Sequence, residues 1–461
     1  MGAHCKSLNA EVLMQKLTQA LSPLIAGALA VGASTNAFGI TLGEMATLAK
    51  QNDAQYIQAE ANYIETRESL PQARSNLLPS LEASLGRSEI DSEIGGLPAG
   101  ANAYSVGLTG EYATNNVAVN LRQPIYNHGS WAGYDAAKAQ VNSAEASYQT
   151  AKQSLLLRLT SRYFDALTAE DTLRFAKAEQ EAIARQLEDV EKRFEVGSIP
   201  ETDVKESRAA YDLAQAEVIS AENALRNARE ALFTMVGQSV ELSPLQGELE
   251  YAPPQPDDVN AWQEAALQGN AALLAAQANY SALSEEASAR QAQHYPSLDL
   301  LASYNQNDFV DGNYDGLEQE ETRITLQLTV PIYSGGATSS AVRSVIARRD
   351  ASQSLLSYQR RQAQQDARNA YYDLKAASAR ARALSVALES RMASREAIKD
   401  GFDAGTRTST DVLDAEREVR RTQRDNARAR YDYLLATLRL KEAAGTLSSA
   451  DIAAIDGLLE H

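Results

Sequence analysis

The sequence predicts a mainly α-helical chain with long coiled-coil-like helices, four β-strands and two internal repeats. Three observations predict this class. Two runs of more than 60 residues lack both proline and glycine, four segments alternate apolar with polar residues, and motifs of the first half return in the second. Aromatic residues make up only 6% of the chain while alanine is abundant, so the helices are expected to pack closely along small side chains.

Charge and composition exclude several classes of protein. The chain has 43 Lys and Arg against 61 Asp and Glu, a net charge of −18, which argues against binding nucleic acid. The four histidines (4, 128, 294 and 461) are scattered, and Cys5 is the single cysteine, so neither a disulfide framework nor a multi-cysteine zinc site is predicted. With no glycine-rich phosphate loop either, we expect no catalytic residues, no metal, no cofactor and no enzymatic activity.

Residues 1–37 are interpreted as a secretory signal peptide. Two lysines precede an apolar stretch at 21–33, and Thr35 and Ala37 are small residues at the −3 and −1 positions. Pro23 and Gly27 interrupt the stretch, which argues against a membrane anchor. No later segment is long and apolar enough for a membrane-spanning helix. We therefore expect export beyond the cytoplasm, and any entry into a membrane would have to be as a β-barrel.

The positions of proline and glycine predict the helices. Residues 134–196 and 337–400 contain neither, and as helices each would be about 95 Å long. Each run is followed, after a glycine-containing turn, by a second uninterrupted run, at 201–236 and 406–444. Helices of this length are typical of coiled-coil packing.

Four segments have the two-residue period of β-strands. Leu81, Ala83 and Leu85 belong to the first, and the others lie around residues 117–121, 298–304 and 324–330. They form two predicted hairpins, at about 79–126 and 296–333. Periodicity alone leaves two interpretations open: hairpins that cap a helical bundle in water, or the wall of a barrel with lipid outside and a wet lumen inside.

The chain repeats itself. Residues 194–197 (Phe-Glu-Val-Gly) return as 402–405 (Phe-Asp-Ala-Gly), and residues 123–126 (Gln-Pro-Ile-Tyr) return as 330–333 (Val-Pro-Ile-Tyr). Each half is predicted to contain a helix, a hairpin, a long helix, a tip turn and a helix. We assign the first repeat to 38–247, the second to 248–447, and a C-terminal tail to 448–461.

These motifs carry a resemblance to a known family. Residues 328–336 (Leu-Thr-Val-Pro-Ile-Tyr-Ser-Gly-Gly), 405–415 (beginning Gly-Thr-Arg-Thr-Ser-Thr-Asp), 429–434 and 445–447 resemble the TolC-like outer-membrane efflux and secretion channels, in particular the TolC branch. The resemblance implies a homotrimer whose four strands per protomer make a twelve-stranded β-barrel, joined to an α-helical barrel with a mixed girdle around its middle. Physics favours the oligomer independently, because four strands cannot close a barrel and open sheet edges are not tolerated in lipid.

The resemblance also implies a function. It predicts an outer-membrane channel and periplasmic tunnel, a passive duct exporting small toxic compounds, proteins or both by tripartite efflux or type I secretion. The implied partners are outer-membrane lipid, a periplasmic adaptor (membrane fusion) protein, and an inner-membrane pump or ABC exporter. The alternative is an exported periplasmic coiled-coil scaffold or adaptor. The two strand hairpins that end in Pro-Ile-Tyr distinguish these, since a scaffold does not need them.

Asp411 and Asp414 are candidates for a cation-selective gate. They lie three residues apart at a predicted helix start, so they share one helical face. One interpretation makes them first-turn carboxylates favoured by the helix dipole, with Thr408 or Ser409 as the cap. The resemblance implies instead a ring of six carboxylates around the periplasmic entrance of a trimer, where crowding would raise some of their pKa values. The first-repeat counterparts are Asp203 and Glu206.

The resemblance also implies a latch at the periplasmic entrance, that is, a set of polar contacts that holds the entrance shut. Arg407 matches the arginine that links hairpins in the closed state of the family, and Thr202 and Asp203 match its partners. Phe402 departs from the pattern, because the matching residue in the TolC branch is a tyrosine that donates a hydrogen bond, which phenylalanine cannot do.

Two glycines occupy the predicted tip turns. Gly197 and Gly405 match the turns at which an adaptor docks in the family. Both also fit the ordinary role of a helix-ending glycine in the left-handed conformation.

Overall fold

The computed structural model describes residues 40–92, 110–247, 249–310 and 316–460. The predicted signal peptide and the first residues of the predicted first repeat lie outside these ranges. Residues Ile40–His461 form one compact unit, to which the description below applies.

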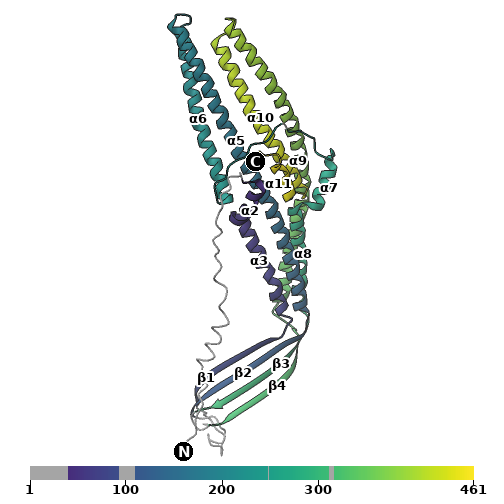
Figure 1. The fold of residues 1–461 in the computed structure, drawn as a ribbon. Coiled ribbons are helices and arrows are strands. Elements are labelled where there is room, and N and C mark those ends of the chain that lie inside the picture. Colours follow the sequence, from purple (N-terminus) through teal and green to yellow (C-terminus); the bar gives the residue numbers. More distant parts are fainter. Residues whose placement is uncertain (1–39, 93–109, 248, 311–315, 461) are drawn as a thin grey trace, which may run out of the picture. The chain divides into compact units, whose positions relative to one another are not determined.

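The elements of the two halves follow the same order (Figure 1). The first half contains α2 (Leu42–Asn52), α3 (Ala54–Ser75), β1 (Ser80–Ser92), β2 (Gly110–Asn127), α5 (His128–Glu195) and α6 (Glu201–Val236). The second contains α7 (Val259–Gly269), α8 (Ala271–Ala292), β3 (Ser297–Phe309), β4 (Glu318–Thr329), α9 (Ala337–Asp403) and α10 (Ser409–Ala443), and α11 (Ser449–Asp456) follows. Corresponding helices have nearly equal lengths, for example 68 residues in α5 and 67 in α9. The predicted repeat of elements is therefore present in three dimensions.

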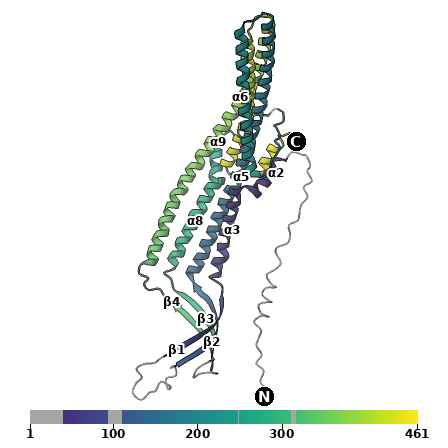
Figure 2. The same ribbon diagram turned by 90° about the vertical axis from the view of Figure 1, so that its left-hand side faces the viewer.

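Helix α5 is the central element of the helical part. It starts after Asn127, whose side chain accepts a hydrogen bond from the Ser130 N–H, and it runs for about 100 Å. One half of α5 packs against α3 and α8 (Figure 2), and the other half packs against α6 and α10 (Figure 1). None of the described helices contains a stretch that is long and apolar enough to cross a lipid bilayer.

The four strands form one antiparallel sheet in the order β1-β2-β3-β4, which confirms the number of strands predicted. The register aligns apolar positions across the sheet, such as Leu81 with Leu121 and Leu300 with Leu326. The opposite face is polar and contains the ion pair of Arg122 with Asp299 at 3.2 Å. Strand β2 continues through Pro124, where the register with β3 shifts.

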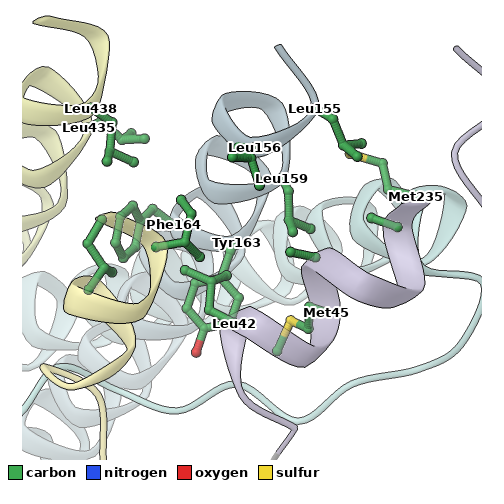
Figure 3. Close-up of a cluster of buried hydrophobic side chains, with 14 of the residues drawn as sticks. Leu42, Met45, Leu155, Leu156, Leu159, Tyr163, Phe164, Met235, Leu435 and Leu438 are labelled. Atoms are coloured by element: carbon green, nitrogen blue, oxygen red, sulfur yellow. The ribbon is translucent and has the colours of Figure 1, made fainter. Parts of the chain in front are cut away.

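The largest hydrophobic core surrounds the middle of α5 (Figure 3). Leu155, Leu159 and Phe164 of α5 are fully buried there, together with Met45 of α2. The Tyr163 hydroxyl accepts a hydrogen bond from the Ser243 N–H and donates one to the Ser243 carbonyl, each at 3.0 Å. Burial raises the pKa of Tyr163 to about 12, so this hydroxyl stays protonated.

The segment that we predicted as a C-terminal tail contains a helix that belongs to the same core. Ile452 and Ile455 of α11 are buried, and Ser448 and Asp451 form a capping box at its start. The N–H of Leu42 donates a 2.7 Å hydrogen bond to the Asp456 carboxylate, which ties α11 to α2. The two ends of the described chain therefore meet beside α5.

Candidate functional site

The turns between α5 and α6 and between α9 and α10 lie at the end of the long helices that is remote from the sheet (Figure 1). Gly197 and Gly405 have φ values of 72° and 75°. In each turn the glycine N–H and the N–H of the next residue bond to carbonyls of the preceding helix, which is a Schellman motif. A Cβ at either glycine would meet no atom within 4 Å, so the backbone conformation alone requires glycine. The helix-ending role is confirmed at both positions, and adaptor docking there stays a prediction.

Asp411 caps the start of α10. Its carboxylate accepts hydrogen bonds from the N–H and the hydroxyl of Thr408, both at 2.9 Å, and its own N–H bonds to the Thr408 hydroxyl at 3.2 Å. These bonds, the backbone one first, hold the pKa of Asp411 below its usual value. The capping interpretation is thus confirmed for Asp411, with Thr408 as the cap.

Asp414 lies one turn further along the same face of α10. Its side chain is 67% exposed and lies 3.8 Å from the guanidinium of Arg417. An exposed pair of this kind contributes little to stability, so Asp414 remains available to ions in solution.

Within one protomer the structure does not bring the predicted latch together. Arg407 is exposed, and its guanidinium makes no hydrogen bond or ion pair with any residue in the described ranges. The Thr202 hydroxyl instead donates to the neighbouring Asp203 carboxylate at 3.3 Å. A link from Arg407 to the hairpin of an adjacent protomer therefore stays a prediction.

Other contacts join the two hairpins near their tips, and sequence analysis missed them. The guanidinium carbon of Arg193, in the last turn of α5, lies 4.5 Å from the centroid of the Phe402 ring in α9. The Thr410 hydroxyl donates to the Glu206 carboxylate at 3.4 Å. Leu413 packs into an apolar cluster with residues of α5 and α6. No sequence signal indicates the contact of Arg193 with Phe402, because the two residues belong to different repeats and lie far apart in the chain.

A charged groove of about 490 Å³ lies beside this cluster, between α5, α6 and α10. Four arginines of α10 line it: Arg417, Arg420, Arg421 and Arg424. They face two carboxylates, Glu217 of α6 and Glu179 of α5, and the pKa of Glu179 is raised by partial burial although Arg417 and Arg424 oppose the shift. The seam between the hairpins is therefore charged at this level.

Within the described ranges, no group of three or more His, Cys, Asp or Glu residues is arranged to hold a metal ion.

Comparison with known proteins identifies the family. Residues 45–238 and 262–446 match the family described as outer membrane efflux protein. This chain belongs to that family. It is 33% identical over 436 residues to the outer membrane protein TolC of Vibrio cholerae serotype O1, covering 94% of this chain and 97% of the relative. It is 28% identical to the alkaline protease secretion protein AprF of Pseudomonas aeruginosa, covering 90% of this chain and 87% of that protein.

A solved structure agrees on the fold. The outer membrane protein VceC of Vibrio cholerae superposes with a TM-score of 0.73 at 19% identity, covering 88% of this chain and 96% of VceC. The resemblance stated from the sequence is confirmed. As a member of the outer membrane efflux protein family, the chain is an outer-membrane channel protein for efflux or type I secretion, with its helices in the periplasm, and it is not an enzyme. The alternative of a periplasmic scaffold is set aside.

Proposed function

We propose that three copies of this chain form one continuous passive duct through the outer membrane and the periplasm, which is gated at the hairpin tips. The observation that carries the proposal is the sheet, which presents an exposed apolar face and two open edges.

The apolar face extends across all four strands. Its members share one side of the sheet by register, and several are largely exposed in the protomer: Leu81, Leu85, Ile324, Leu326 and Leu328. A contiguous exposed apolar surface of this kind indicates contact with lipid. Strands β1 and β4 are each paired on one side only within the described sheet. Three sheets, joined β4 to β1, close these edges as a barrel of twelve strands.

The helices have matching free faces. Helix α6 packs mainly on α5, and exposes Ile219. Helix α9 lies at the other side of the protomer, beyond α10, and exposes Val386 and Met392. Packing α9 of one protomer against α6 of the next covers both faces and closes a helical tunnel.

The gate lies at the narrow end of this tunnel. Threefold symmetry would assemble Asp411 and Asp414 into a ring of six carboxylates that selects cations. Arg407 would bind Thr202 or Asp203 of an adjacent hairpin and hold the end shut. A periplasmic adaptor would dock at the tips around Gly197 and Gly405 and connect the duct to an inner-membrane pump or ABC exporter.

The cargo is small toxic compounds, a secreted protein, or both. The proposal for a protein cargo is supported by the relative named for secretion of an alkaline protease.

The test is the behaviour of the purified protein. We expect it to fractionate with outer membranes, to run as a heat-sensitive trimer in detergent, and to conduct ions in planar bilayers. A monomer recovered in the soluble periplasmic extract would overturn the proposal.

A further inference from the structure

The contact between Arg193 and Phe402 joins the two hairpin tips of one protomer. A guanidinium whose carbon lies 4.5 Å from the centroid of an aromatic ring is within the range of a cation–π interaction. Both side chains come from the last turn of a long helix, and each helix ends at a Schellman glycine a few residues later. The contact therefore couples the ends of α5 and α9 directly.

Arg193 is held in position for this contact. Its Nε lies 2.8 Å from the carboxylate of Asp189, one turn earlier in α5. Such an i,i+4 pair limits the rotamers of a long side chain. The remaining guanidinium surface is directed at the Phe402 ring, which is itself partly buried.

The other contacts between the tips are weaker or lie deeper. The hydrogen bond from Thr410 to Glu206 is long, at 3.4 Å, and exposed. The apolar cluster around Leu413 and Ile183 lies several turns before the end of α5. The Arg193–Phe402 contact therefore lies nearer to the ends of α5 and α9 than the apolar cluster does.

We propose that Arg193 is a positioning residue that holds Phe402, and with it the α9–α10 hairpin, against the α5–α6 hairpin of the same protomer. The interaction uses the ring face, so it needs no hydroxyl at position 402. That the separation of these tips opens the duct rests on the proposed function; the contact itself does not.

The experiment measures the distance between the tips directly. Spin labels are attached through Val196→Cys and Ala404→Cys; the single native cysteine, Cys5, lies in the predicted signal peptide and is replaced by Ser so that an uncleaved chain takes up no further label. Pulsed electron resonance on trimers assembled with an excess of unlabelled parent protein, so that most carry one labelled protomer, then gives the label-to-label distance within a protomer. We expect Phe402→Leu and Arg193→Gln each to increase the population of separated tips about fivefold. Phe402→Tyr and Phe402→Trp, which keep a ring face, should retain the parent distance.

Matched controls remove the same groups from the same tip without touching the contact. Phe194→Leu removes an exposed ring, and Lys192→Gln removes an exposed cation paired with Glu188. Both should leave the distance unchanged. Parent-like distances in Phe402→Leu and Arg193→Gln would overturn the proposal, as would an equal effect of the controls.

Conductance in planar bilayers separates this proposal from the proposed function. If Phe402→Leu separates the tips and raises conductance, both stand. If it separates the tips and leaves conductance unchanged, the contact stands and the tips are not the gate.

Discussion

At the scale of single residues, the carboxylate of Asp411 has a structural role at the start of α10 and a proposed role in the cation-selective ring. Its hydrogen bonds with Thr408 cap α10 and stabilise the charged form, whereas crowding in a ring of six would favour protonation. The cap thus keeps the aspartate ionised where the proposed gate needs charge. The sequence indicated both roles but could not show that the structure lets one support the other.

The carboxylate ring predicts block by multivalent cations. Asp411→Asn with Asp414→Asn removes both charges while keeping an oxygen that can accept from the Thr408 N–H, so α10 should remain capped. We expect a trivalent cation on the periplasmic side to bind at least on the order of tenfold more weakly in this variant. Bilayer conductance measures the block. Asp403→Asn, which removes an exposed tip carboxylate outside α10, is the control, and an equal loss of block there would remove the ring from the gate.

Thr408→Ala predicts a shift in the pH dependence of that block. The Thr408 hydrogen bonds hold the pKa of Asp411 below its usual value, so their stabilisation is present at neutral pH and is lost as the pH falls through the pKa of folded Asp411. Losing the hydroxyl raises that pKa. The block should therefore disappear at a higher pH in Thr408→Ala than in the parent, as measured by titrating conductance with acid. Identical titration curves would show that Asp411 does not carry the block.

Arg407→Ser tests the latch between protomers. The guanidinium makes no hydrogen bond or ion pair with the described residues of its own protomer, and only its charge acts on the nearby Asp411, so its loss should leave the fold intact. We expect a higher single-channel conductance because the tips are no longer restrained. Arg185→Ser, which breaks an exposed pair with Glu181 in α5, should conduct like the parent. Parent-like conductance in Arg407→Ser would place the latch elsewhere.

At the scale of secondary-structure elements, α5 and α10 are joined at a buried polar contact on the side of the charged groove that faces away from the tips. The Tyr431 hydroxyl donates to the Asp171 carboxylate at 2.8 Å, and the Tyr431 ring stacks on Phe164. Burial, and then the charge of Asp171, raises the pKa of Tyr431 well above its usual range, so the tyrosine remains a donor. This contact joins the α5–α6 hairpin to the α9–α10 hairpin at the end of each hairpin that is remote from the tip turns.

Tyr431→Phe should weaken that junction. The change keeps the ring but removes the donor to a carboxylate that is only 7% exposed, which costs about 2 kcal/mol per protomer. Scanning calorimetry in detergent should show a lower transition temperature. Tyr372→Phe, at a position that is 54% exposed, should have no effect. Equal transition temperatures for parent and Tyr431→Phe would mean that the junction carries no net stability.

Most of the elements could be predicted because their signals are local. The absence of proline and glycine indicated α5 and α9, although α5 starts before the predicted run because Asn127 caps it despite two nearby glycines. Strand β2 extends past the predicted alternation because the sheet tolerates Pro124 at a register shift. Helix α11 was missed because its eight residues carry too short a pattern, and its burial depends on α2 at the other end of the described chain.

The contacts at the site were less predictable. Spacing along α10 placed Asp411 and Asp414 on one face, but the approach of Arg193 to Phe402 depends on how two helices from different repeats pack. Sequence periodicity indicates which face of a helix is apolar. It does not indicate which side chains from distant parts of the chain pack against that face.

At the scale of the whole molecule, we propose a passive duct, so the loss of the protein should be seen in transport. Deleting the gene should sensitise cells to detergents or dyes, or leave a secreted protein inside the cell. Growth inhibition and secretion assays measure the two outcomes, and a plasmid copy should restore the parent phenotype. Unchanged sensitivity and unchanged secretion, with the protein verified absent, would contradict the duct.

The order of the sheet has a consequence for stoichiometry. Because each protomer contributes four strands in up-and-down order, β1 and β4 run in opposite directions. The junction between neighbouring protomers is therefore antiparallel in a ring of any size. Strand pairing alone does not determine how many protomers the ring contains. The number three would have to come from the helices, through the angle at which α9 of one protomer meets α6 of the next. Substitutions along that helical seam, rather than in the sheet, are where a change in the size of the ring would originate.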